Sequence, residues 1–309
     1  MKPCHLLSVG VALCLVSETS ALAQEFSGAS FEINRPRVEM GGIGACAKSA
    51  TYLVPTAYLY IAARTKVGAG GTLRSVGVRA TVYTDGLTKS GIQSMAAQMH
   101  NEIVSQLRAA GAKVLTFDDV RDDVSGKARM AINPRYGMPT KDMRQFPGID
   151  FFVATPNDDQ AVDFGMMGPQ ALYGAAAKRT GATLLMPQVW LTLPQLSATA
   201  SASEGFTWRS TSAGINGSPA MKLAGAWING LNAKGAWCSI TVPEHGTRLP
   251  APVAGTFQEL SSSTDSYGDW SIKRGDWSFV VNPAAFQTGG QAVARSLGKL
   301  VGDSMNGRK

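Results

Sequence analysis

The chain has 309 residues, of which 44% are hydrophobic, only 17% are charged and 34 are glycine. Soluble proteins carry roughly 25% charged residues, so this chain is poor in charge but has enough apolar residues to form a core. This composition excludes a disordered or collagen-like chain, and four cysteines are too few for a small disulfide scaffold. The net charge of +7 comes without a dense basic run, so we expect no nucleic-acid partner.

The N-terminus has the three parts of a secretory signal peptide. Lys2 is basic, residues 6–16 are apolar, and Ala21-Leu22-Ala23 precedes Gln24 as a small-residue cleavage site. The apolar run is well short of the ~20 residues that a transmembrane helix needs. We therefore expect residues 1–23 to be removed after Ala23, and the mature chain to be periplasmic or associated with the outer membrane of a Gram-negative bacterium.

Cleavage would leave two of the four cysteines, Cys46 and Cys238. In an oxidising compartment two cysteines most simply form one disulfide, and the alternative is a pair of buried free thiols. Neither cysteine has a histidine nearby in the sequence, which disfavours a catalytic thiol. The sequence thus favours a disulfide between Cys46 and Cys238.

The clearest structural pattern is a β–α–β unit that begins near residue 73. Apolar residues alternate over 73–84, which predicts a half-buried strand, and recur at helical spacing over 88–110. Gly111 follows as the residue that ends the helix, and 113–117 is predicted as the next strand.

A second β–α–β unit follows, with a helix that Gly181 ends. Its elements are predicted as a strand over 151–154, a helix over 169–179 and a long strand over 182–193. Small alternating residues then predict a β-hairpin over 195–214 with a loop to 219. The remaining chain is predicted to form a hairpin of strands 221–229 and 236–242, a loop over 243–268, a strand over 271–281 and a helix over 283–305.

These elements predict an α/β (α+β) fold: a mixed twisted sheet flanked by helices, with an inserted β-hairpin and a C-terminal docking helix. Residues 24–70 are expected to form an N-terminal extension, and 71–309 a single domain with the hairpin inserted near 195–219. In the last helix Gly298 and Gly302 are four residues apart, which permits a close backbone approach. We expect that spacing to serve packing on the sheet in preference to dimerisation.

No catalytic or metal-binding constellation stands out, and we expect no cofactor. Beyond the signal peptide the histidines are His100 and His245, in separate elements and without a neighbouring ligand pattern. The acidic residues at 118–123 could act as acid and base, but a solvated helix N-terminus is the favoured interpretation. We therefore predict a protein that is not an enzyme, with a hydrolase whose residues converge only in space as the third hypothesis.

A seven-residue repeat is the main candidate binding motif. Gly-Asp-Trp-Ser occurs at 268–271 and again at 275–278, so Trp270 and Trp277 with Asp269 and Asp276 could form a glycan-stacking platform. The alternative is that tryptophan suits a pleated surface and Gly-Asp suits the turns between strands. In the earlier hairpin, the aromatic pair Phe206 and Trp208 is the candidate interaction element.

The order of elements resembles the periplasmic α/β domain of the curli assembly/transport component family and its relatives. The resemblance covers about residues 73–309 and rests on Ala110-Gly111-Ala112-Lys113-Val114, Thr180-Gly181-Ala182-Thr183-Leu184-Leu185 and Leu231-Asn232-Ala233-Lys234-Gly235-Ala236-Trp237. The lipidated cysteine that this family carries at the mature N-terminus is missing, and 133–168 has no counterpart.

The resemblance implies a non-catalytic envelope protein that acts in assembly, secretion or as an adaptor, and that binds itself or other envelope proteins. In channel-forming members the inserted hairpins enter the membrane, but alanine is a poor lipid-facing residue, so a periplasmic scaffold is favoured over a pore. The alternative function is a periplasmic glycan- or anion-binding module, whose partner would be an anionic envelope polymer or lipid surface.

Overall fold

The computed structural model describes residues 31–33, 43–70, 76–124, 146–161, 168–204, 209–242, 247–253, 255–267 and 270–307. The signal peptide with its cleavage after Ala23, the hairpin residues Phe206 and Trp208, His245 and Asp269 lie outside these ranges, so these expectations stay predictions. Of the helices within the described ranges, none combines the length and hydrophobicity needed to cross a membrane.

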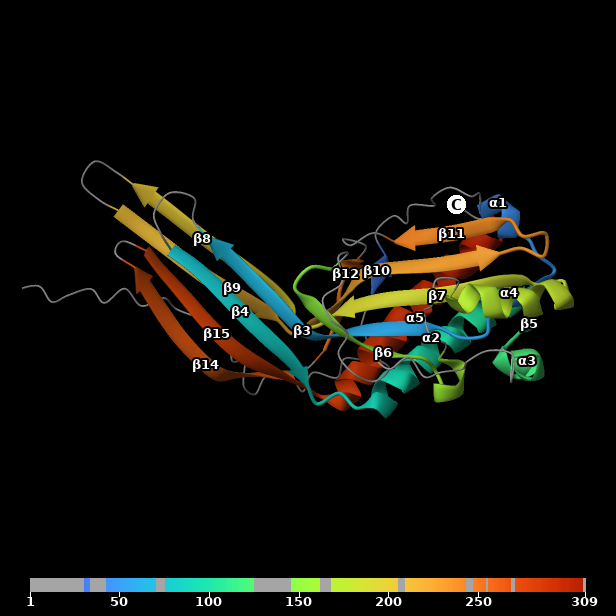
Figure 1. The fold of residues 1–309 in the computed structure, drawn as a ribbon, viewed down its shortest axis with the longest axis horizontal. Coiled ribbons are helices and arrows are strands. Elements are labelled where there is room, and N and C mark those ends of the chain that lie inside the picture. The colour runs from blue at the N-terminus through green and yellow to red at the C-terminus, as the bar shows by residue number, and fades with distance from the viewer. Residues whose placement is uncertain are drawn as a thin grey trace, which may run out of the picture.

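One mixed sheet organises the described residues (Figure 1). Along its main path the strands follow the order β11 (Trp237–Val242), β10 (Ala220–Leu231), β7 (Thr183–Thr192), β3 (Tyr58–Gly70), β4 (Val76–Asp85), β15 (Trp270–Val281) and β14 (Gly255–Tyr267). The β3–β7 and β4–β15 pairs are parallel, and the other pairs on this path are antiparallel. The predicted α/β class with a mixed sheet is confirmed.

Shorter strands extend this sheet at its branches. They are β2 (Thr51–Leu53), β5 (Lys113–Leu115), β6 (Ile149–Ala154) and β13 (Ala251–Pro252), while β1 (Glu32–Ile33) and β12 (Thr247–Leu249) form a separate pair. Residues 43–70 therefore contribute β2 and the central strand β3 to the domain, whereas the sequence predicts an N-terminal extension over 24–70. The physical reason is burial, because residues 58–63 of β3 are buried on both faces of the sheet.

Two long helices pack side by side along the body of the sheet (Figure 1). Thr88 caps α2 (Lys89–Ala109) by accepting a hydrogen bond from a backbone N–H, and Gly111 follows its end at a φ of 88°. Asn282 caps α5 (Pro283–Met305) in the same way. The predicted helices at 88–110 and 283–305 are confirmed.

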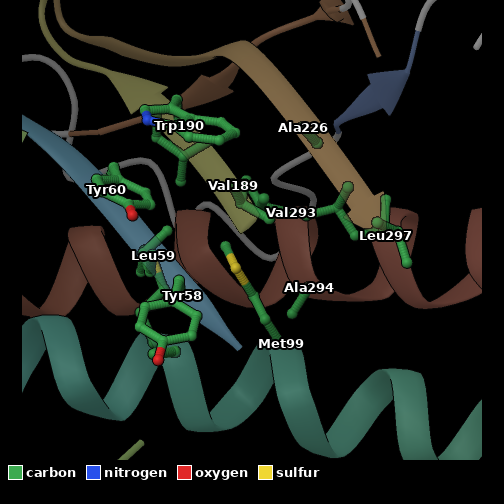
Figure 2. Close-up of a cluster of buried hydrophobic side chains, with 14 of the residues drawn as sticks. Tyr58, Leu59, Tyr60, Met99, Val189, Trp190, Ala226, Val293, Ala294 and Leu297 are labelled. Carbon is green, nitrogen blue, oxygen red and sulfur yellow. The ribbon is translucent and has the colours of Figure 1, made fainter. Parts of the chain in front are cut away.

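The main core lies between these helices and the sheet. Figure 2 shows Val189 of β7 facing Val293 and Leu297 of α5, and all three side chains are at most 1% exposed. Tyr60 and Trp190 stack away from α5, with ring centroids 4.8 Å apart. Large apolar side chains thus fill the body of the molecule.

The glycines of α5 contact α2. A Cβ added at Gly298 would lie 3.1 Å from the backbone carbonyl carbon of Glu102, and one at Gly302 would lie 3.0 Å from Cβ of Gln106. Residues four apart share one stripe of a helix, so these positions let the two helix backbones approach closely. The expected packing of this stripe on the sheet was wrong, because its partner is a second helix of the same chain.

Two shorter helices and a disulfide complete the body. Tyr173 of α4 (Gly168–Thr180) is fully buried and meets Phe117 of α3 (Phe117–Val124) edge to face at 6.5 Å. A disulfide joins Cys46, the last residue of α1 (Ile43–Cys46), to Cys238 of β11 with a Cα–Cα distance of 6.0 Å. The predicted disulfide is confirmed.

The sheet continues beyond the helices as an elongated projection, at the left of Figure 1. Residues 58–65 of β3 pair with β6 or β7, whereas residues 64–70 pair with β4. We use the name β-arm for residues 64–70, β4, β14, β15 and the hairpin of β8 (Gln195–Glu204) and β9 (Arg209–Ser218), and the name body for the rest. The predicted hairpin is confirmed, with its second strand running to Ser218.

The segment 243–268, predicted as a loop, contains three strands. The longest is β14, which has 13 residues and pairs with β15 along its whole length. Seven of those residues are serine, threonine or glycine, and most are exposed, so the segment lacks the apolar alternation that indicates a strand.

Candidate interaction site on the β-arm

The hairpin packs an alanine-rich face against the sheet of the β-arm. Ala198 and Ala200 are partly buried against the core, and Ile215, the partner of Ala198, is 5% exposed. The intervening Ser197 and Thr199 are exposed. The Ala/Ser alternation in the sequence therefore reflects a half-buried hairpin whose outer surface carries hydroxyl groups.

The second Gly-Asp-Trp triplet has a packing explanation. Trp277 is 3% exposed, and its ring lies so close to Gly275 that an added Cβ would collide with it. Because side chains alternate along a strand, the intervening Asp276 lies on the opposite face, where it accepts a hydrogen bond from Ser261 Oγ at 3.1 Å. Glycine makes room for the indole and aspartate faces outward.

This burial contradicts the expected platform of two exposed tryptophans. Trp277 is covered, so it is not available for stacking on a glycan. The side chain of Trp270, like Asp269, lies outside the described part of the chain. Of the four residues proposed for this motif, Asp276 alone is shown with its side chain accessible on the outer face.

Strand β14 is an open edge of the sheet. Within the described residues it pairs only with β15, and from 255 to 266 every residue other than Gly255, Phe257 and Asp265 is exposed. Edge strands are usually protected from pairing by lysine, proline or a bulge. β14 has neither lysine nor proline, and its one register shift leaves Leu260 58% exposed.

The opposite side of the β-arm sheet has a second open edge. The Lys66 N–H donates a hydrogen bond to the Gly148 carbonyl at 2.7 Å, and beyond it residues 67–70 pair with β4 alone in the described structure. Lys66 is exposed beside this edge, whereas Glu259 is exposed on β14. The two edges therefore differ in the sign of their local charge.

His100 is a buried side chain that links two elements of the body. It is 8% exposed, and its Nε2 donates a hydrogen bond to the Val54 carbonyl at 2.7 Å, which ties α2 to the end of β2. Its Nδ1 lies 3.3 Å from Asn101 Oδ1. No serine and carboxylate pair contacts this ring among the described residues, so the geometry does not support His100 as a catalytic base.

The acidic residues at 118–123 lie along α3, with Asp118 and Asp119 in its first turn, and Asp118 and Asp123 form ion pairs at the surface. Asp119 accepts a hydrogen bond from the Thr116 N–H at 2.7 Å, as expected at a helix start. Arg121 bridges Asp118 and Asp159 at 2.8 and 2.9 Å, and the hydrogen bond to Asp118 raises the pKa of Arg121. Asp118 and Asp119 therefore lie at a solvated helix N-terminus, as predicted.

Among the described residues no group of three or more His, Cys, Asp or Glu side chains is placed to hold a metal ion. The chain matches no family model, no curated protein and no solved structure.

Proposed function

We propose that this protein is a non-catalytic assembly component of the bacterial envelope, and that its β-arm joins copies of the chain by strand pairing. The observation that carries the proposal is the open edge of β14, with 13 residues and no protecting lysine or proline. Such an edge presents a row of unpaired N–H and C=O groups that can pair with another strand.

The occupant that the β-arm fits best is a second copy of itself. One edge of its sheet is β14, which carries the exposed Glu259, and the other is residues 67–70, next to the exposed Lys66. Asp265 and Arg64 are paired within the chain, with Arg274 and Asp150. Pairing β14 of one copy with this edge of the next would bring opposite charges together. Because the two surfaces differ, the contact is heterologous and generates a ring or a filament.

The location in the envelope rests on the N-terminal sequence and on the disulfide. Residues 1–23 have the pattern of a cleaved signal peptide. The Cys46–Cys238 disulfide fits an oxidising compartment. The resemblance to the curli assembly/transport component family adds self-association or envelope proteins as the partners.

Two lysines on the open edge should separate the copies. The variant Ser262→Lys with Thr264→Lys places charges on exposed side chains of β14. We expect the wild-type chain to form a defined oligomer by sedimentation velocity, and the variant to dissociate at least tenfold more readily, because edge lysines oppose strand pairing.

A matched control adds the same charge to the body. Ser105→Lys with Ala109→Lys changes two exposed residues of α2, which belongs to the body and not to the β-arm, and should leave the sedimentation profile unchanged. A wild-type chain that stays monomeric at about 100 μM, well above the range of specific pairing, would contradict the proposal, as would equal dissociation of both variants.

A further inference from the structure

The outer face of the β-arm sheet contains a hollow of about 540 Å³. Four neighbouring strands line it, and their residues stand in two cross-strand rows, Lys66–Thr81–Asp276–Ser261 and Gly68–Arg79–Arg274–Ser263. Gly68 lines the hollow without a side chain of its own. Arg79 lies across it, with its Cγ 3.4 Å from where a Cβ on Gly68 would be.

The charges in this hollow are unbalanced. Arg274 is paired through its Nε with Asp265 at 2.7 Å, and Asp276 is engaged by Ser261. Neither Lys66 nor Arg79 has a carboxylate within ion-pair distance in the described part of the chain, and both are exposed. Three cations thus surround a hollow whose own lining contains one carboxylate.

Two arginines in the hollow face each other across neighbouring strands, which disfavours the folded β-arm. Arg79 and Arg274 are direct partners on the parallel strands β4 and β15. Like charges that face each other directly across strands are destabilising. The ion pair of Arg274 with Asp265 offsets part of this cost, and an anion bound between the two arginines would offset the rest. This arrangement is therefore more readily explained by an anionic ligand than by the folding of the arm.

We infer that this hollow binds a phosphorylated saccharide. Arginine and lysine supply the donors that recognise phosphate, and guanidinium groups do so with two parallel hydrogen bonds. Beside them, Thr81, Ser261 and Ser263 offer hydroxyl groups, and Asp276 offers an acceptor for sugar hydroxyls.

The size of the hollow agrees with this ligand class. Ligand sites usually measure roughly 300–1,000 Å³, and the value of about 540 Å³ is larger than inorganic phosphate alone requires. The site is independent of the buried Trp277, whose ring lies on the other face of the same strand.

Calorimetric titration of the mature chain tests the site, with glucose 1-phosphate as the probe. We expect binding that weakens at high salt, that is at least tenfold stronger than binding of glucose or of inorganic phosphate, and that weakens at least tenfold in Arg79→Gln and in Arg274→Gln. The thermal midpoint of Arg79→Gln should be equal to or above that of the wild type, since the change removes a like-charge pair.

Two control measurements complete the titration experiment. Arg295→Gln, an exposed arginine of α5 outside the β-arm, should bind glucose 1-phosphate like the wild type. The Ser262→Lys and Thr264→Lys variant is titrated in parallel, so that loss of self-association and loss of the ligand site are distinguished. Equal binding of inorganic phosphate would overturn the saccharide part, and unchanged binding in both arginine variants would overturn the site.

A vesicle experiment distinguishes a free sugar phosphate from a lipid-linked one. The protein is mixed with phosphatidylcholine vesicles that contain a phosphorylated glycolipid, and with vesicles that lack it. If the ligand is a lipid headgroup, the protein should be retained only on the vesicles that contain the glycolipid.

Discussion

The body and the β-arm share one sheet but are covered in different ways. In the body, α2 and α5 bury the sheet under large apolar side chains such as Val189, Val293 and Leu297 (Figure 2). In the β-arm, a hairpin of alanine, serine and threonine covers one face, and the other face is polar and carries the hollow. The single strand β3 thus runs through two environments of very different hydrophobic content.

This difference shows how each region is held together. Burying a large apolar side chain contributes roughly 1.5–3 kcal/mol. The body has many such contributions and the arm has fewer, from Trp277, Phe279, Ile215 and the valines at 78, 82 and 281. The arm depends more on hydrogen bonds between backbones. At its two open edges, one side of each edge strand has no pairing strand within the described part of the chain. Three variants test this comparison.

The largest effect is expected from the disulfide of the body. Cys46→Ala with Cys238→Ala opens a link between residues 192 positions apart and should lower the free energy of unfolding by about 5 kcal/mol in the chain-entropy description. Urea denaturation measures this loss. A decrease below about 1 kcal/mol would show that the body does not need the link.

A smaller, local effect is expected from the main aromatic residue of the β-arm. Trp277→Ala removes a buried ring and uncovers Gly275, which should destabilise the arm by about 3 kcal/mol. Hydrogen exchange should quicken in β4, β14 and β15 and stay unchanged in α2 and α5.

The control for this variant is Trp237→Ala in β11, because Trp237 is 55% exposed and should change stability by less than about 0.5 kcal/mol. If Trp277→Ala accelerated exchange equally in the helices, the arm and the body would form one cooperative unit.

The smallest of the three effects concerns the contact between α2 and α5. Gly298→Ala puts a Cβ 3.1 Å from the Glu102 backbone and 2.5 Å from its Cγ, and the resulting overpacking should cost about 2 kcal/mol in thermal or urea unfolding. Gly44→Ala is the matched change in α1, where no atom lies within 4 Å, and it should be neutral or slightly stabilising. Equal values for both glycines would mean that the helices can separate without cost.

The β–α–β units could be predicted because their signals are local. The apolar stripe of α2, the cap Thr88 and the chain reversal at Gly111 are adjacent in the sequence, and the same holds for α4 and Gly181. Strand β14 could not be predicted in this way. Most of its side chains are exposed, and Phe257 is the apolar side chain that packs against the core, so no hydrophobic alternation marks the segment. Its pairing with β15 makes it a strand.

The central strand β3 was missed for a different reason. Residues 58–63 form a continuous apolar run, which is typical of a strand buried on both faces, and this was the available signal. The hollow had no such signal. Lys66, Arg79 and Arg274 come from three strands, and their meeting depends on the parallel pairing of β4 with β15.

The sequence by itself determined the long helices, the hairpins and the class of the fold, and it singled out the two cysteines that form the disulfide. Those features follow from the periodicity of neighbouring residues and from the two cysteines that remain when the predicted signal peptide is left out. The tertiary structure alone decided that Trp277 is buried and that the glycines of α5 meet a helix. It also decided that a serine-rich segment ends the sheet and that three cations share one hollow. These outcomes depend on which surfaces come together, and in each case the partner is distant in the chain.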